Sequence, residues 1–308
     1  MRDHVVARLK ELALENPKIV LITGDLGFGV LNAFCEECAG QFINAGIAEQ
    51  NMTGLAAGMA LEGHVVFTYS IGNFPTLRCL EQLRNDVCYH GANVNVLAVG
   101  GGFSYGSLGM SHHATEDISI MRALPNMRVI VPSDPWQAAQ TVDVMVTDPR
   151  PCYLRIDKSA AGLDPIPGAG FILGKARRVR GGTDAIIVSA GSIVAECLSA
   201  VDALAARGIE TGLIEMPTIK PIDRDAIAEA CARVSLIVTV EEHSVIGGLG
   251  GAVAEVMAEI GGGARLVRIG LEDVYSSVVG SQAYLRRYYA MDGEAITRRI
   301  EQELRQVL

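Results

Sequence analysis

The chain has 308 residues, of which 49% are hydrophobic and 20% are charged, and its formal net charge at pH 7 is −9. This length predicts two domains of about 150 residues each, and the acidic balance argues against a nucleic-acid or anionic-membrane partner. No apolar run approaches the roughly 20 residues of a membrane-spanning helix, and residues 1–16 form an amphipathic pattern rather than a signal peptide. We therefore expect a cytoplasmic protein.

Apolar runs and helical stretches alternate through the first half of the chain. The expected strands are, in chain order, 18–24, 40–46, 64–70, 93–100, 127–133 and 152–157. Helices are expected to begin near Glu49, Thr76, Glu116 and Asp134. Continuous apolar strands separated by helices indicate a parallel sheet that is covered on both faces.

A break follows, in which residues 158–174 contain two prolines and four glycines and show neither periodicity. Beyond it, strands are expected at 184–191, 211–216, 235–242 and 265–270, with helices over 193–207, from Asp223 and after Gly251. We predict an α/β protein of two domains, each a mostly parallel sheet with helices on both faces. The predicted boundaries are 1–158 for the first domain, 159–174 for a linker and 175–308 for the second domain.

Polar side chains gather where the expected strands of the first domain end. Asp25 follows the first strand, Glu49 the second, and His112 and His113 lie in a glycine-rich loop after the fourth, while Arg155 lies near the end of the last. Ligands of open α/β sheets bind at the carboxyl ends of the strands. The pattern therefore predicts a ligand site in the first domain.

Each of these candidates also has a structural interpretation. Glu49 can be a helix-dipole acid, because carboxylates stabilise a first helical turn. The two histidines can be surface residues of a flexible loop, and Arg155 can either bind an anionic group or pair with Asp157. From the residue types alone these alternatives stay open.

Two further motifs are weak signals. Residues 99–106, VGGGFSYG, could cradle phosphate through backbone amides, but no Lys-Ser/Thr pair follows them. Cys35 and Cys38 have metal-like spacing without a second pair or a histidine cluster nearby, and a structural zinc site normally needs four ligands. We predict no metal site here, and we expect the seven scattered cysteines to be reduced and buried.

A family resemblance enters at residues 44–63, NAGIAEQNMTGLAAGMALEG. This segment resembles the pyrimidine-binding domain of transketolase-like thiamine-diphosphate enzymes, in which GI-x-E introduces the cofactor glutamate. The likeness continues through 67–87, the histidine-containing loop, 122–138 and 151–158. In the second half, 211–223, 238–255 and 278–296 resemble the C-terminal domain of the same family.

The resemblance implies roles for the residues near Glu49. The matching glutamate hydrogen-bonds N1′ of the cofactor's aminopyrimidine and promotes the 4′-imino form, which removes the proton from C2 of the thiazolium. Glu49 is thereby expected to be desolvated, and Phe74 matches an aromatic residue that stacks on the pyrimidine. The other residues expected to bind the cofactor are Ile47, Gln50, Ile71 and Arg78.

The resemblance also implies a set of substrate contacts. His113 matches a loop histidine that contacts substrate hydroxyls and, with Glu49, is assigned a catalytic role. Arg155 matches an arginine that holds a sugar phosphate, a task suited to the bidentate guanidinium. His112 and Asp25 complete the expected substrate-binding residues.

The chain departs from the family pattern at several positions of the expected site. Gly109 stands where transketolases have an acidic residue four positions before the loop histidine, and Ile71 replaces a second stacking aromatic. The family's other loop histidine, near Phe103 or Ser104, is missing. These differences bear on the substrate more than on the cofactor.

The family's diphosphate-binding domain is absent from this sequence. That domain carries a GDG…N motif that binds the diphosphate and Mg²⁺, and the GDL at Gly24 is not that motif. We therefore expect a partner chain that supplies the Mg²⁺ ligands, an α2β2 assembly, and active sites between unlike subunits.

The prediction is the C-terminal (β) subunit of a split transketolase, active only with its partner. It would be a transferase of aldehyde or ketone residues (EC 2.2.1) in carbohydrate metabolism, moving a two-carbon ketol unit from an anionic ketose to an aldose through a thiamine-diphosphate carbanion. The anionic group would be phosphate or another acid such as sulfonate. Alternatives are a deoxyxylulose-phosphate-synthase-like enzyme, the E1β subunit of a 2-oxoacid dehydrogenase, and a non-catalytic scaffold homologue.

Overall fold

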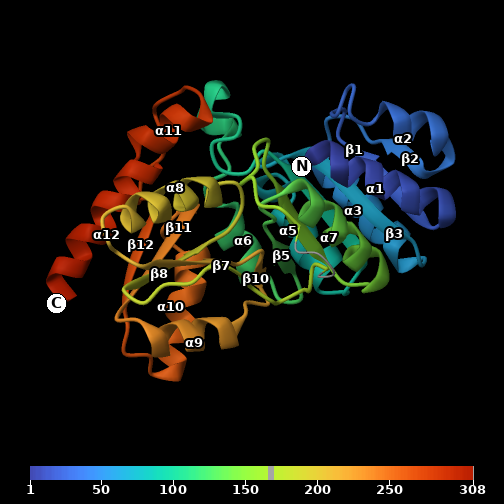
Figure 1. Ribbon diagram of the computed structural model, residues 1–308. Helices are drawn as coiled ribbons and strands as arrows, with labels where there is room; N and C mark the ends of the chain where they lie inside the picture. Colours follow the sequence, from blue (N-terminus) through green and yellow to red (C-terminus); the bar gives the residue numbers. More distant parts are fainter. Residues whose placement is uncertain (166–169, 308) are drawn as a thin grey trace.

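Two β-sheets organise the chain in a computed structural model that describes residues 1–165 and 170–307 (Figure 1). The first sheet has seven strands in the order β10-β5-β6-β4-β3-β1-β2. These strands are β1 (Ile19–Thr23), β2 (Phe42–Asn44), β3 (Val65–Ile71), β4 (Val94–Val99), β5 (Arg128–Ile130), β6 (Cys152–Ile156) and β10 (Thr218–Lys220). All neighbouring strands in it are parallel except β10, which is antiparallel to β5.

The second sheet has five strands in the order β12-β11-β8-β9-β7. They are β7 (Arg177–Arg180), β8 (Ala185–Ser189), β9 (Thr211–Glu215), β11 (Leu236–Ser244) and β12 (Arg265–Leu271). Only the edge strand β7 runs antiparallel to its neighbour, β9. We call the parts of the chain around the two sheets the first unit and the second unit.

Helices accompany both sheets. Those of the first half are α1 (Arg2–Glu15), α2 (Asn32–Glu37), α3 (Glu49–Leu61), α4 (Phe74–Leu77), α5 (Leu80–Gln82), α6 (Asp117–Ala123) and α7 (Pro135–Thr147), with a π-helical turn at Leu83–Cys88. Those of the second half are α8 (Val194–Ala205), α9 (Arg224–Arg233), α10 (Leu249–Ile260), α11 (Gln282–Tyr288) and α12 (Gly293–Val307). The α12 helix ends at the left edge of Figure 1.

The period of two along a strand divides the core of the first unit into two layers. On β1, Ile19 and Leu21 pack into a cluster with residues of α1 and α7, whereas Val20 and Ile22 pack into a cluster with residues of α3. Both layers are apolar, which is why the strands read as unbroken hydrophobic runs. The α3-side cluster continues into β8 and α10 of the second unit, so the two sheets share one core.

The expected fold class, α/β with mostly parallel sheets and helices on both faces, is confirmed. The short edge strands β7 and β10 and the helices α2, α11 and α12 were not expected from the sequence. The helix expected near Thr76 begins at Phe74, and the one expected after Gly251 begins at Leu249. The boundaries 1–158, 159–174 and 175–308 stay predictions, and residues 166–169 of the predicted linker lie outside the described residues.

Within residues 1–165 and 170–307, no helix combines the length and the apolar composition needed to cross a membrane.

Leu97 offers a test of this core, because it is fully buried on the central strand β4. Leu97→Ala should lower the free energy of unfolding by about 2–5 kcal/mol, since it removes buried methyl groups and leaves a cavity. Leu14→Ala, at an exposed position of α1, is the matched control and should change it by less than about 0.5 kcal/mol. Urea unfolding of both variants measures the difference, and equal losses would contradict this core.

Candidate functional site

Glu49 lies at the mouth of a strand-to-helix turn. It is the first residue of α3 and only 4% of its surface is exposed. The chain reaches it from β2 through Gly46, whose φ of 73° is a conformation that glycine adopts without strain. Because β1 and β2 are parallel neighbours, the end of β1 is close by, and a Cβ on Gly24 would lie 3.8 Å from Glu49 Oε1.

Arg78 joins Glu49 to an aromatic ring. Its Nη1 donates a hydrogen bond of 3.1 Å to Glu49 Oε1, and its Cζ lies 3.9 Å from the centroid of the Phe74 ring. The Arg78 side chain is 47% exposed, so this contact is open to solvent on one side. A planar nitrogen group thus stacks on Phe74 while it donates a hydrogen bond to a buried carboxylate.

An aminopyrimidine ring can make the same two contacts, stacking on Phe74 and a hydrogen bond to Glu49. Such a ring is planar, stacks on an aromatic face, and can share a proton with a carboxylate through a ring nitrogen. Glu49 Oε2 makes no hydrogen bond to the described part of the chain, and the guanidinium of Arg78 already stands between Glu49 and Phe74. The residues present therefore fit the pyrimidine end of thiamine diphosphate.

The row of contacts continues from Phe74 along the loop after β4. The His112 ring lies 5.3 Å from the Phe74 ring and 6.4 Å from the Tyr105 ring, centroid to centroid. Lys158 Nζ lies 3.6 Å from the Tyr105 centroid, just beyond the end of β6. A row of pairwise contacts thus runs through Glu49, Arg78, Phe74, His112, Tyr105 and Lys158 at the carboxyl end of the first sheet.

Lys158 is a cation that the sequence alone did not single out. Partial burial lowers the pKa of its amine, and the nearby cation of Arg2 lowers it further. Among the described residues no carboxylate lies within ion-pair distance of Lys158, so its charge is not neutralised there. Its position just after a strand end is the sequence feature that could have identified it.

His113 turns away from this row. It is 3% exposed, its Nε2 lies 3.1 Å from the carbonyl oxygen of Gly106, and its ring packs edge-on against Phe103 at 5.1 Å. Asn73 donates a hydrogen bond to its backbone carbonyl. His112, rather than His113, therefore lies beside Phe74, and the catalytic role expected of His113 stays a prediction.

Arg155 is buried between the two units, at 3% exposure. Its Nη2 donates to the carbonyl oxygens of Glu242, at 2.8 Å, and Ala114, at 3.4 Å. Its Nη1 lies 3.5 Å from Asp117 Oδ1, and its Nε lies 3.9 Å from Asp157 Oδ1. This arrangement does not support the expected contact with a substrate anion, which stays a prediction.

The remaining candidates are Asp25, Ile47, Gln50 and Ile71. The amide of Asn44 donates to Asp25 Oδ1 at 3.0 Å, which holds Asp25 beside the end of β2 at a φ of 59°. Ile47 is 76% exposed, Gln50 is exposed in the first turn of α3, and Ile71 is half-buried at the end of β3. Among the described residues, no contact of Ile47, Gln50 or Ile71 defines a binding role for it.

No group of three His, Cys, Asp or Glu side chains in the described residues could hold a metal ion. Cys35 and Cys38 are both free thiols, the first half-buried and the second buried.

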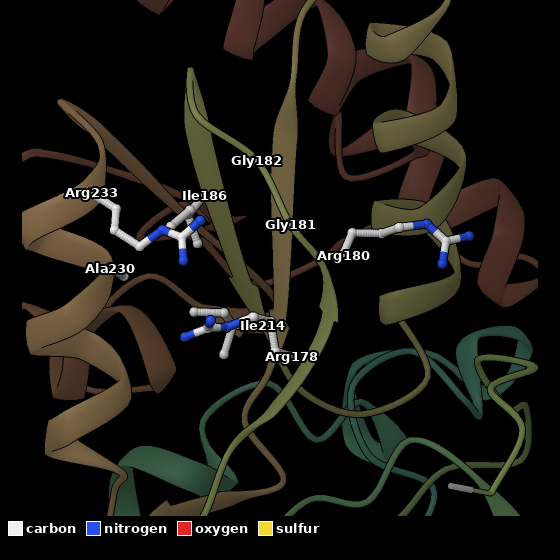
Figure 2. A pocket seen from close by; sticks show the side chains of 8 residues that line it. All are labelled: Arg178, Arg180, Gly181, Gly182, Ile186, Ile214, Ala230 and Arg233. Carbon is white, nitrogen blue, oxygen red and sulfur yellow. The ribbon is translucent and has the colours of Figure 1, made fainter.

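Figure 2 shows a separate cavity in the second unit, between β7, β9 and α9. Arg178 at its rim pairs with Glu229 at 2.6 Å, while Arg180 extends toward the opposite side of the ribbon. This cavity shares no residue with the row from Glu49 to Lys158 and is not part of that site.

Comparisons with known proteins identify the family of the chain. Residues 1–162 match the transketolase pyrimidine-binding domain, and residues 174–296 match the transketolase C-terminal domain. One subunit of the apulose-4-phosphate transketolase of Phocaeicola vulgatus is 37% identical over 297 residues, covering 96% of this chain and 94% of that protein. The 6-deoxy-6-sulfo-D-fructose transketolase subunit SqwH of Clostridium sp. (strain MSTE9) is 34% identical over 299 residues, covering 97% and 92%.

A solved structure described as a split gene transketolase, inactive beta4 tetramer, superposes on this chain with a TM-score of 0.88. It is 35% identical in sequence and the match covers 98% of this chain and 97% of that one. The whole chain, rather than one unit, therefore has a counterpart in a split transketolase.

The contact between Arg78 and the aromatic row can be tested through His112. Burial lowers the pKa of His112, and the cation of Arg78 lowers it further. Arg78→Ala removes this cation, so the pKa of His112 should rise toward 6.5. NMR titration of labelled histidines measures this change. Arg84→Ala, on the neighbouring π-helical turn, is the control, and an unchanged pKa in Arg78→Ala would contradict the arrangement.

Proposed function

The chain belongs to the transketolase family, and from this membership we propose that it is the C-terminal subunit of a split transketolase that transfers a two-carbon ketol unit from an anionic ketose to an aldose. The observation that carries the proposal is the buried carboxyl of Glu49 beside the Phe74 ring, with a planar cation between them. Relatives that the chain matches over nearly their whole length are themselves single subunits of transketolases or a split transketolase.

Glu49 and Phe74 would hold the pyrimidine end of thiamine diphosphate. Phe74 offers its ring for stacking, and the buried Glu49 would hold a proton at the pyrimidine N1′, where water cannot compete for it. The chemistry that the cofactor supplies when bound is a nucleophilic carbon that cleaves the bond next to a ketone carbonyl. Arg78 leaves its place on Phe74 in this proposal, which its half-exposed side chain allows.

The diphosphate end of the cofactor and its Mg²⁺ require a second polypeptide in this proposal. The described residues include no group suited to a metal ion, and the matched family domains are the pyrimidine-binding and C-terminal ones. We infer an α2β2 assembly with a diphosphate-binding partner chain. A cytoplasmic location is part of the proposal, and the seven free cysteines support it because a reducing compartment keeps thiols unpaired.

Lys158 and Arg2 would hold the anionic end of the sugar. Lys158 is exposed beside Tyr105 at the far end of the row from Glu49, with Arg2 as a second cation nearby. The names of the two relatives specify sugars that carry phosphate in one case and sulfonate in the other, and both groups are anions. The charge of Lys158 therefore suits the substrate class without distinguishing its members.

The role of Glu49 can be tested with Glu49→Gln in the complex with the partner chain. The amide cannot carry the proton that N1′ requires, so transfer should slow by about 10²–10⁴-fold. Glu62→Gln, at the exposed end of the same helix, is the matched control and should leave the rate unchanged. Calorimetric titration with thiamine diphosphate and Mg²⁺ should show binding to the unmodified complex and none to the isolated chain.

Tight cofactor binding by the isolated chain would contradict the split site. Activity with a 2-oxoacid, and none with a ketose phosphate, would instead favour a dehydrogenase E1β role.

The role of Lys158 predicts a substrate-dependent defect. Lys158→Met should raise KM for an anionic ketose about tenfold or more, because a hydrogen bond to a charged group contributes about 1.5–3 kcal/mol. KM for an uncharged ketose should not change. Lys18→Met, before β1 at the other end of the sheet, serves as the control. Equal effects of Lys158→Met on charged and uncharged ketoses would rule out the anion contact.

A further inference from the structure

The loop that carries His112 and His113 is closed at its base. Gly102 and Ala114 exchange two backbone hydrogen bonds, of 2.8 and 2.9 Å, in an isolated antiparallel bridge. Between them the chain makes two short 3₁₀ turns, Gly106–Leu108 and Met110–His112. We call residues 101–114 the histidine loop. It belongs to the first unit, but its base lies on side chains of the second unit.

Glu242, near the end of β11, makes the central contact with this loop. Its Oε1 accepts a hydrogen bond of 2.6 Å from the backbone N–H of Phe103. Gln282 Nε2 donates to both carboxylate oxygens, at 2.9 and 3.2 Å, and Arg286 Nε donates to Oε2. Glu242 and Arg286 are both buried, so these charge-assisted bonds are not weakened by competing water.

Close packing against the side chains of Tyr105, Arg155 and Glu242 explains the glycine run at the start of the loop. A Cβ on Gly100 would lie 2.1 Å from the Tyr105 ring, and one on Gly101 would lie 1.8 Å from Arg155 Nε. A Cβ on Gly102 would lie 2.4 Å from Glu242 Oε1, and its φ of 56° also favours glycine. The sequence suggested that backbone amides of this glycine run could bind phosphate. Close packing is a different physical reason for the glycines, and the Phe103 N–H already donates to Glu242.

Arg155 of the first unit links the far end of the histidine loop to the second unit. Arg155 Nη2 donates to the carbonyl oxygens of Glu242 and of Ala114, which follows His113 directly. The Phe103 ring packs between His113, at 5.1 Å, and Tyr289 after α11, at 5.5 Å. The carboxylate of Glu242 thus fixes the start of the loop, and Arg155 connects the end of the loop to the backbone carbonyl of the same residue.

Building on the proposed function, we propose that Glu242 is a positioning residue for substrate binding: by holding the Phe103 amide it sets the histidine loop so that His112 lies beside Phe74. The contact geometry carries this assignment, since Glu242 touches the loop backbone but none of the residues in the row from Glu49 to Lys158. Small displacements of a positioned group can cost large factors in rate. The second unit thereby contributes a positioning residue to a site whose other residues lie on the first unit.

Glu242→Ala and Glu242→Gln separate positioning from general stability. Glutamine keeps an oxygen that accepts the Phe103 N–H, while alanine keeps none. In the full chain, Glu242→Ala should speed hydrogen exchange at the Phe103 amide at least tenfold, and Glu242→Gln should speed it less. In the complex, Glu242→Ala should raise KM for the ketose about tenfold with little change in cofactor Kd, because Glu49 and Phe74 are untouched.

Glu301→Gln is the matched control, since it weakens the ion pair with Arg207 in the same unit and does not touch the loop. Should Glu242→Ala fail to fold, Gln282→Leu removes the amide that donates to both carboxylate oxygens and should give a smaller effect of the same kind. Unchanged exchange in the histidine loop, or the same change in Glu301→Gln, would overturn the proposal. So would a cofactor Kd that weakens in step with KM.

The two proposals fail in distinguishable ways. If the chain did not act as a transketolase subunit, the unmodified complex would lack transfer activity and cofactor binding, whereas the exchange result would still report on Glu242. If Glu242 did not position the loop, the unmodified complex would be active and the exchange result would be negative.

Discussion

The buried guanidinium of Arg155 requires the two units to dock as they do. A charged group removed from water is costly unless hydrogen bonds and opposite charges compensate it. Asp117 and Asp157 of the first unit supply opposite charge, but the shortest hydrogen bond of Arg155 goes to the carbonyl of Glu242 in the second unit. Asp117 is itself fixed by the hydroxyl of Tyr153, at 2.6 Å. Separating the units would leave this cluster only partly compensated.

Two further features make the junction rigid. Strand β10 comes from the second half of the chain but pairs with β5 at the edge of the first sheet. The hydrophobic cluster beneath α3 continues without interruption into β8 and α10. The units are therefore connected by backbone hydrogen bonds and a shared core as well as by buried charges. A loop anchored to such a junction has a fixed reference for its position.

The two adjacent histidines show what this anchoring achieves. His113 is buried against Phe103 and is bonded to Gly106, while His112 lies across from Phe74 and Tyr105. Because neighbouring side chains in an extended or tight turn point in different directions, only one of the two can face the row that leads to Glu49. Which one does so depends on how the base of the loop is held, and that base rests on the second unit.

Local pattern and family likeness were enough to predict the α/β class, most strands, and Glu49 at the mouth of a strand-to-helix turn. Unbroken apolar runs and short turn motifs contain that information, since each depends on a few consecutive residues. The edge strand β7 is mostly arginine and β10 is only three residues long, so neither forms an apolar run. Their pairing partners, β9 and β5, are distant in the chain. The contacts of Arg155 and Lys158 and the orientation of the histidine loop were also beyond the sequence. An arginine at a strand end has the same local sequence whether its side chain faces solvent or a second sheet. For Arg155 the docking of the second unit determines the outcome, because it places the Glu242 carbonyl within hydrogen-bond distance.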